Sequence, residues 1–197
     1  MSGYVDFPLT VYAFHGCDET VAERVFAGET DLQPSTNRYD WLGTGVYFWE
    51  NAPARAMRWA IDSQKRHPDR IHKPAVVGAI VHLGHCMNLM DKESNAVLSD
   101  AFHQLEALIT RESKHGRQLI LPENKGKNHN LDALVINFSH VFAEAKRHPF
   151  DTVRAAFIEG VPVFNGSSIM SDTHIQLCVR NPKKSVVAYF RPRVALT

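Results

Sequence analysis

The segment Leu42-Gly43-Thr44-Gly45-Val46-Tyr47-Phe48 gives the clearest indication of the architecture, because two glycines stand directly before a short apolar run. Gly45–Trp49 predicts a short strand. The preceding residues 30–44 are rich in Pro, Ser, Thr, Asn, Asp and Gly, which predicts an exposed loop. The aromatic pair Tyr39 and Trp41 is unusual in such a loop, and either ligand binding or packing onto the domain would explain it.

The residues before this loop predict a strand followed by a helix. Val11–Phe14 is a short apolar run that ends at His15-Gly16, so we expect His15 to lie in a strand-to-helix loop. Thr20 and Glu23 have the spacing of a capping box. Apolar residues then recur at helical spacing up to Gly28, a suitable stop for the helix.

A second helix is expected directly after the strand at Gly45–Trp49. Asn51 can cap a helix that runs from about Ala52 to Lys65, with Pro53 tolerated in its first turn. One face of this helix carries Ala56, Trp59 and Ala60. Residues at this spacing are more often core residues than cofactor contacts.

The remaining chain alternates apolar runs with polar segments. Ala75–Leu83 is rich in β-branched residues and predicts a central strand that ends at Gly84. Residues 100–114 have helical periodicity, whereas 115–130 predict a long, mobile surface loop. The other segments are the apolar run Leu131–Ile136, helical signals near 139–147 and 151–159, and strand candidates at Thr173–Val179 and Ser185–Phe190.

Composition bounds the class of protein. The chain has 197 residues, 44% of them hydrophobic and 22% charged, which predicts one soluble globular domain over residues 1–197. Its first residues carry no basic region followed by an apolar stretch, and no run of about 18 apolar residues occurs. The three cysteines Cys17, Cys86 and Cys178 argue against a disulfide framework. We therefore expect a cytoplasmic protein without a membrane partner.

Three segments, in order, carry a resemblance to a known superfamily. The first segment consists of His15-Gly16, a short helix, a loop with Pro34 and then Leu42–Phe48 with a following helix. It resembles the NAD-binding half of poly(ADP-ribose) polymerase-like ADP-ribosyltransferases. Val76–Gly84 and Gln176–Pro182 resemble two later strands of the same enzymes. The resemblance implies an α+β ADP-ribosyltransferase fold, with two packed antiparallel-rich sheets, flanking helices and an NAD cleft.

The resemblance also implies roles for individual residues. His15 would bond the adenosine ribose, and the main chain of Gly16 could clamp the nicotinamide carboxamide. Tyr47 would stack on the nicotinamide, with room left by Gly45, and Trp59 is the candidate for a second stacking ring. The alternative is that Tyr47 and Trp59 are core aromatics.

The third catalytic position departs from the polymerases. They carry a glutamate there, whereas the matching residue in this chain is Gln176, which cannot act as a base. The expected site is therefore His15, Tyr47 and Gln176, and the expected reaction adds a single ADP-ribose. Glu50 or Asp172 could supply the missing carboxylate, and a shift of register would place His174 in the role.

Other chemistry has weaker support. His82, His85 and Cys86 suggest a zinc site, but they lack a second ligand pair, and strand alternation would point the two histidines to opposite faces. Cys17 beside His15 suggests a thiol nucleophile, although neighbours in sequence rarely have the required geometry. We therefore expect NAD⁺ as a substrate and no metal.

A compact catalytic domain of this type suggests a bacterial or phage toxin or a defence effector, with an antitoxin protein as a partner. Its acceptor would be protein or nucleic acid. The net charge of +1 gives no overall attraction to nucleic acid. Nucleic acid is slightly favoured by a group of basic residues: Lys125, Lys127, Lys183, Lys184, Arg191 and Arg193. The alternatives are an NAD⁺ glycohydrolase and a catalytically inactive module that binds NAD⁺ or ADP-ribose.

Overall fold

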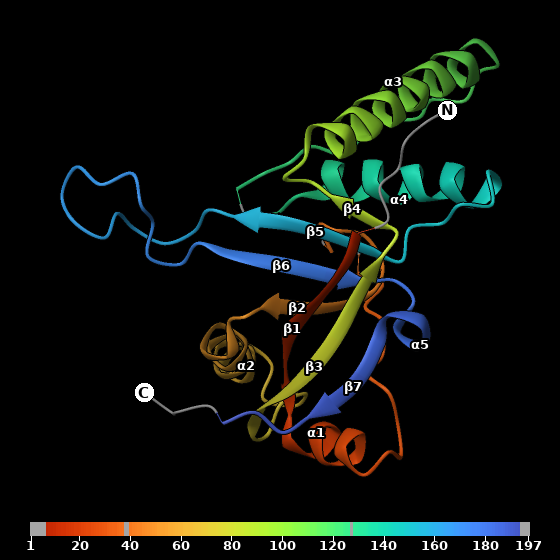
Figure 1. Cartoon of the computed structure of the whole chain (residues 1–197). Coiled ribbons are helices and arrows are strands. Elements are labelled where there is room, and N and C mark those ends of the chain that lie inside the picture. The colour runs from red at the N-terminus through yellow and green to blue at the C-terminus, as the bar shows by residue number, and fades with distance from the viewer. Residues whose placement is uncertain (1–6, 38–39, 127, 194–197) are drawn as a thin grey trace.

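The computed structural model describes residues 7–37, 40–126 and 128–193, so Tyr39 and Lys127 lie outside the described residues. Helices and strands combine in an α+β fold around one mixed sheet of seven strands, in the order β4-β5-β6-β2-β1-β3-β7 (Figure 1). The strands are β1 (Phe7–Asp18), β2 (Val46–Glu50), β3 (Pro74–Gly84), β4 (Cys86–Asn88), β5 (Thr152–Phe157), β6 (His174–Val179) and β7 (Val186–Phe190). The helices are α1 (Glu19–Phe26), α2 (Pro53–Arg66), α3 (Lys92–Lys114), α4 (Asn130–Ala145) and α5 (Pro182–Ser185).

The sheet has two halves, which meet at β1 and β2. Strands β2, β5 and β6 run across the view in Figure 1, whereas β1, β3 and β7 run steeply to them. The halves are joined through two residue pairs, Ala13 with Glu50 and Phe14 with Trp49. The α+β class is therefore confirmed, but the expected two packed sheets are not found, because this short pairing makes the described strands one sheet.

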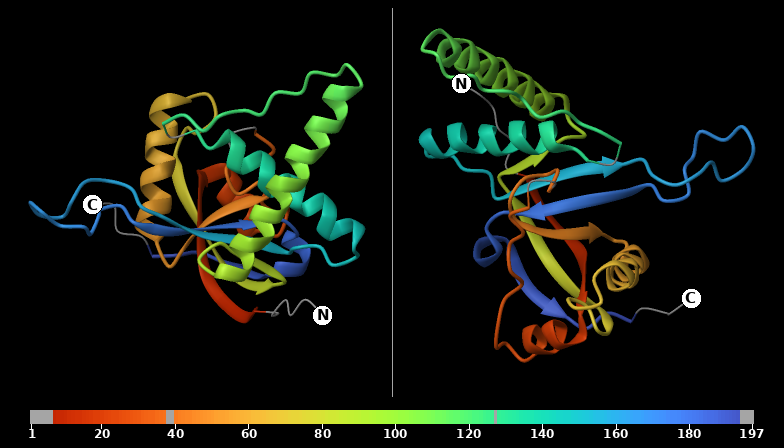
Figure 2. Two further views of the ribbon diagram at one scale, coloured as in Figure 1. Left: turned by 90° about the horizontal axis from the view of Figure 1, so that it is seen from above. Right: turned by 180° about the vertical axis from the view of Figure 1, so that it is seen from behind.

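Helices cover different parts of this sheet. Helices α3 and α4 lie together at one end of the molecule and α1 lies at the other, while α2 packs beside β1 and β3 (Figure 2). On β2, alternation sends Val46 and Phe48 into a core shared with β3 and β6, while Tyr47 and Trp49 point to the other face. Consecutive residues of β2 therefore serve different sides of the sheet.

His15 lies within a strand, and the prediction that it lies in a loop was wrong. Strand β1 continues through His15 because its pairing with β3 extends to Asp18 and Pro74. The cap of α1 also differs from the prediction of Thr20 and Glu23. Asp18 is the N-cap, and its Oδ1 accepts a hydrogen bond from the main-chain N–H of Thr20 at 2.9 Å.

The segment 151–159 was predicted as helical, but it forms β5. Val153 and Ala155 point into the core and alternate with Arg154, whose partner is Glu50 on β2. Helix α4 begins at Asn130 and so includes the apolar run Leu131–Ile136.

Other predicted segments were nearly correct. Helix α2 and strands β3, β6 and β7 lie within about a residue of their expected positions. Asn51 does not cap α2: its φ is +51°, and Ala52 is the N-cap without a side-chain hydrogen bond. Within the part of the chain that the structure describes, no helix has the length and apolar character needed to cross a membrane.

Candidate functional site

The predicted residues His15 and Tyr47 meet where the pairing between β1 and β2 ends. The last paired residues are Phe14 and Trp49. Directly beyond them, Nδ1 of His15 lies 2.7 Å from the main-chain carbonyl oxygen of Tyr47. A side chain thus occupies the space between the strands, and we call the region between residues 15–18 of β1 and 46–48 of β2 the β1–β2 gap.

The protonation of His15 follows from this contact. Because a carbonyl oxygen only accepts, Nδ1 donates the hydrogen bond, and the neutral ring presents Nε2 as an acceptor. Burial lowers the pKa of His15 from its usual value, against the opposing effect of the hydrogen bond to Tyr47. The ring is therefore neutral at pH 7. It lies on the side of Phe48, with ring centroids 5.7 Å apart.

The main chain of Gly16 faces the gap. The N–H of Asn51 donates to the carbonyl of Tyr12 at 2.9 Å, so Tyr12 turns its main-chain groups toward β2. Alternate residues of an antiparallel strand face the same neighbour. Gly16 therefore directs its N–H and C=O toward β2, beyond the last pair of the ladder. This arrangement fits a clamp for a planar carboxamide, which needs one donor and one acceptor.

Gly16 also permits a close approach of α2. A Cβ atom at this position would lie 2.3 Å from the carbonyl oxygen of Ala56 and 3.2 Å from Cε3 of Trp59. Only glycine allows this contact without a shift of the helix main chain. The close approach brings Trp59 beside Gly16, with its ring centroid 5.7 Å from that of Trp49.

Tyr47 has a structural role in addition to its predicted one. Its hydroxyl donates to the carbonyl of Gly43 at 2.8 Å and accepts from the N–H of Leu42 at 2.9 Å. The half-buried ring packs against the core that contains Leu42 and Cys178, and burial raises the pKa of Tyr47. The hydroxyl therefore stays protonated and holds the loop that precedes β2.

Gly45 is explained by packing against β6. A Cβ atom there would lie 2.5 Å from Sγ of Cys178 and 2.7 Å from the carbonyl oxygen of Val179. Gly43 has a φ of +80°, a conformation that favours glycine. The structure thus gives both glycines a reason that does not require a ligand.

Gln176 lies on β6 opposite Trp49, which is itself opposite Phe14 of β1. Strand spacing places Gln176 roughly 10 Å from β1. Because opposed side chains share a face, Gln176 points to the same side as Trp49 and Tyr47. Its Oε1 accepts a hydrogen bond from Nε1 of Trp41 at 2.8 Å. His15 points to the other face, so the structure brings it to the gap but not to the side of Gln176.

Glu50, one alternative for the third position, is fully engaged elsewhere. Arg154 donates to both of its carboxylate oxygens, at 2.6 and 2.8 Å. The Glu50 side chain is 7% exposed, and it follows Trp49 on the strand, so it points to the opposite face. This ion pair joins β2 to β5 and leaves no carboxylate oxygen for a substrate.

The other two alternatives stand farther from the gap along β6. Asp172 precedes the strand and is bound by Arg58. His174 donates through Nδ1 to the carbonyl of Asp172 and stacks on Phe157, with centroids 5.3 Å apart and planes within 7°. Of the three candidates on or before β6, Gln176 lies nearest the gap in the strand register.

An open cavity of about 870 Å³ extends from Trp59 and Gln176. It is also lined by His174, an alternative for the third position, and by residues that sequence reasoning missed: Trp49, Arg55, Arg66, His129, Phe157 and Glu159. Phe157 and Glu159 were assigned to a helix. Strand alternation over 152–157 would have placed Phe157 on the face of Gln176, whereas no local pattern indicates that Arg55 reaches the cavity.

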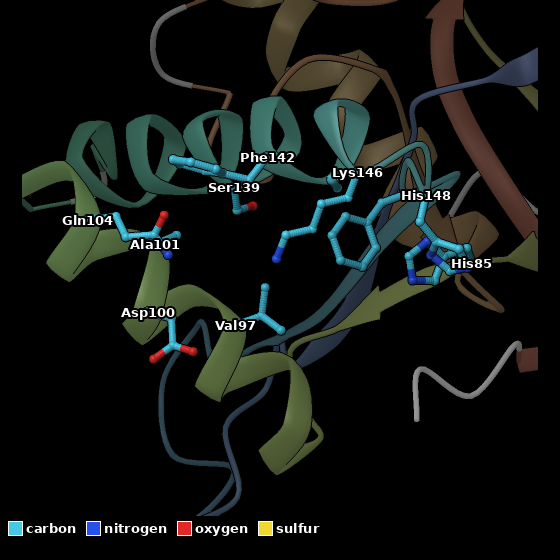
Figure 3. A pocket seen from close by; sticks show the side chains of 11 residues that line it. His85, Val97, Asp100, Ala101, Gln104, Ser139, Phe142, Lys146 and His148 are labelled. Carbon is cyan, nitrogen blue, oxygen red and sulfur yellow. The ribbon is translucent and has the colours of Figure 1, made fainter. Parts of the chain in front are cut away.

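A second, smaller cavity lies between α3 and α4 (Figure 3). Its volume is about 110 Å³, and Val97 and Lys146 point into it. None of the residues predicted for the site lines it. The larger cavity is therefore the candidate site.

Of the basic residues that favoured a nucleic acid, those that the structure describes do not line this cavity. Lys184 lies on α5, directly before β7, and binds Asp151 at 2.7 Å. Arg191 stands at the opposite end of β7 and binds both carboxylate oxygens of Glu23. The expected basic cluster is therefore divided between two places, and these two charges are neutralised by partners.

Thiol and metal chemistry find little support. Burial raises the pKa of the Cys17 thiol to about 12, so it is not a thiolate at pH 7. Over residues 7–37, 40–126 and 128–193, no group of three or more His, Cys, Asp or Glu side chains is placed to hold a metal ion.

The chain matches no protein-family model, no curated protein and no solved structure. The resemblance to ADP-ribosyltransferases therefore rests on the residues of the chain itself.

Proposed function

We propose that this chain is an NAD-dependent mono-ADP-ribosyltransferase that releases nicotinamide and modifies a macromolecular acceptor. One observation carries the proposal: the main-chain N–H and C=O of Gly16 face the β1–β2 gap, between the ring of Trp59 and the bond from His15 to Tyr47. A donor and an acceptor side by side match a carboxamide, and a neighbouring ring matches the nicotinamide to which it is attached.

The reaction breaks the bond between the nicotinamide nitrogen and C1′ of the ribose. Its electron pair leaves with nicotinamide, the acceptor nucleophile bonds to C1′, and the acceptor proton passes to solvent. The protein must therefore hold the leaving ring and orient the ribose. In this proposal Gly16 and Trp59 hold the ring, and Nε2 of neutral His15 accepts a hydrogen bond from a ribose hydroxyl.

Gln176 determines the type of transfer in this proposal. Because Nε1 of Trp41 donates to Oε1 of Gln176, the amide turns its NH₂ group to the other side. That group can hold a ribose hydroxyl oxygen, but it cannot take a proton. The expected product carries one ADP-ribose, because elongation would require the ribose hydroxyl to be activated as a nucleophile.

The test is to incubate the purified protein with NAD⁺ labelled on its adenylate part, in the presence of a cell lysate, and to measure free nicotinamide as well as labelled macromolecules. Labelled macromolecules that depend on His15 support the transferase. Free ADP-ribose without labelled macromolecules would instead show an NAD⁺ glycohydrolase. Unchanged NAD⁺ would show a module without turnover and would overturn the proposal. His15→Ala is the loss-of-function variant, and His82→Ala, at an exposed histidine of β3, is its matched control.

The resemblance extends the proposal to a toxin or defence effector acting in the cytoplasm, with an antitoxin protein as its partner. Expression of the wild-type chain should then arrest growth of the host cell, whereas His15→Ala should not. Equal growth of the two strains at equal protein levels would reject the toxin.

A further inference from the structure

Six ring side chains form a continuous row along the wall of the large cavity. Neighbouring centroids lie 5.7 Å apart for Trp59 and Trp49, 6.5 Å for Trp49 and His174, and 5.3 Å for His174 and Phe157. Trp41 then packs edge-on against Phe157, and its centroid lies 5.3 Å from that of His129. All six line the cavity, so we call them the ring row.

The ring row is assembled from distant parts of the chain. Its members come from the loop before β2, from β2, α2, β5 and β6, and from the residue that precedes α4. Trp41, Trp59, His129 and Phe157 are only partly buried, and Trp41 and His129 stand outside helices and strands. Trp49 and His174 are buried behind them, so four of the six rings remain partly exposed along the cavity.

Charge in the cavity is sparse and slightly positive. The guanidinium of Arg55 lies 5.6 Å from the ring centroid of Trp49, and Arg66 also lines the wall. Glu159 is the one carboxylate among the described residues of the lining, and Arg55 binds it at 2.9 Å. One cation thus remains in excess, so a phosphate backbone would not be repelled.

We infer that the ring row binds the unpaired bases of a single-stranded nucleic acid, which is the acceptor of the transferase. That the strand is the acceptor rests on the proposed function, whereas binding of the strand does not. Planar aromatic faces with cations at their edge are the features by which proteins hold single strands without reading their sequence. A duplex keeps its bases stacked inside and cannot offer them to these rings.

One end of the ring row coincides with the proposed nicotinamide site, whereas the other end lies beyond Gln176. Trp59, at one end of the row, lies beside Gly16, whereas Trp41, near the other end, holds Gln176. NAD⁺ carries two ring systems, fewer than the six in the row. The part formed by Trp41, His129 and Phe157 lies on the β5 side of Gln176, away from β1, and so remains available for the bases of an acceptor strand.

The test measures binding without NAD⁺. Fluorescein-labelled 12-mers of oligo-dT and oligo-U, and a DNA duplex of equal length, are titrated with the full chain, and anisotropy is recorded. Both single strands should bind more tightly than the duplex. Stacking on one aromatic ring contributes about 1–3 kcal/mol per base, so Trp41→Ala should weaken single-strand binding by about tenfold.

Two further variants keep the test decisive. His129→Ala removes an exposed member of the row and should weaken binding severalfold, so a folding defect in Trp41→Ala does not decide the result. Tyr12→Ala removes a ring that is 57% exposed but lies outside the row, and it should bind like wild type. Thermal unfolding checks that all three variants are folded.

Several results would overturn the inference. Equal binding of duplex and single strands, or wild-type binding by both Trp41→Ala and His129→Ala, excludes a base-binding row. Loss of NAD⁺ affinity in Trp41→Ala with unchanged oligonucleotide affinity would assign the row to NAD⁺ itself. No oligonucleotide binding, together with a protease-sensitive label in lysate, would indicate a protein acceptor. Nicotinamide release, measured separately, shows whether the transferase proposal survives any of these results.

Discussion

The two edges of β1 differ in how completely they are paired. Its β3 edge pairs without a break from Thr10 to Asp18, while its β2 edge pairs only at Ala13 and Phe14. The partners on β3 include the fully buried Val77, Ala79 and Val81. The strand therefore stabilises the fold chiefly through one edge, and the other edge is the one at which we propose that nicotinamide binds.

This difference originates in the residues that face each edge. A run of β-branched residues on β3 favours an uninterrupted strand. On β2, the carbonyl that would meet Gly16 in a continued ladder accepts a hydrogen bond from His15 instead. Substitutions on the two edges should consequently affect different properties, stability on the first and nicotinamide release on the second.

The largest effect is expected for Gly16→Ala. The new Cβ would meet the main chain of α2, and a displaced helix would move Trp59 and the Gly16 edge. A displacement near 1 Å can reduce a rate about hundredfold, and overpacking destabilises by about 1–3 kcal/mol. We expect both losses, measured as nicotinamide release and as the free energy of unfolding in urea.

Gly78→Ala is the matched control on the paired edge. Gly78 lies opposite Phe14, and its added Cβ would meet the ring of Phe190, a side chain. It should reduce the free energy of unfolding but leave nicotinamide release per folded molecule near wild type. If Gly78→Ala and Gly16→Ala reduce release equally, the β2 edge has no special role.

The stability of the fold is expected to depend on pH because of a buried histidine on α4. His140 on α4 is 1% exposed, and burial lowers its pKa from 6.5 to about 3. The unfolded chain takes up the proton near pH 6.5, whereas the folded chain does so only near pH 3. Stability is therefore complete above pH 6.5 and falls as the pH drops from 6.5 to 3. Acidification to pH 5 should remove on the order of 2 kcal/mol, measured by urea unfolding.

Substitution of His140 tests whether this residue causes the decrease in stability at low pH. His140→Leu should flatten the decrease in stability between pH 6.5 and 5, whereas His82→Ala, at an exposed histidine, should keep it. An unchanged slope in His140→Leu would show that the acid sensitivity arises from other groups.

A smaller effect of opposite sign is expected for Gln176→Glu. The carboxylate would still accept from Trp41, now in a charge-assisted bond, and it would stabilise positive charge on the ribose. Nicotinamide release should rise by about tenfold, the equivalent of one charge-assisted hydrogen bond. An unchanged rate would remove Gln176 from the third catalytic position.

The smallest effect is expected for Tyr47→Phe. It removes the hydroxyl that bonds Gly43 and Leu42, at a cost of about 1–2 kcal/mol in unfolding free energy, but it keeps the ring. Tyr47→Ala removes both and should lose far more nicotinamide release than Tyr47→Phe. Equal activity of the two variants, measured on folded protein, would mean that the ring does not stack on the substrate.

Elements with one strong local pattern were predictable from the sequence. The β-branched run of β3 and the periodic residues of α2 appear where expected. The extent of β1 was not predictable, because Gly16 resembles a break until the pairing with β3 is known. Strand β5 was not predictable either. Its Arg154 pairs with Glu50, 104 positions earlier, and a local periodicity cannot indicate so distant a partner.

The candidate site shows the same division. His15, Gly16, Tyr47 and Gln176 were predicted from sequence order; the structure places the first three at the β1–β2 gap and Gln176 in the wall of the cavity, on the face opposite to His15. The ring row was not identified as a unit: Trp41, Trp59 and His174 were each singled out for separate reasons, and Trp49, His129 and Phe157 were not. Its other members become neighbours only when β5 and β6 pair.

The bond from His15 to Tyr47 has a consequence for the energetics of ligand entry. Because an imidazole spans the two strands, their separation is fixed before any ligand arrives. A ligand bound at Gly16, as proposed, would not have to part a closed sheet or break main-chain pairs between β1 and β2. The site is in this sense pre-organised, and its affinity should depend little on motions of the sheet.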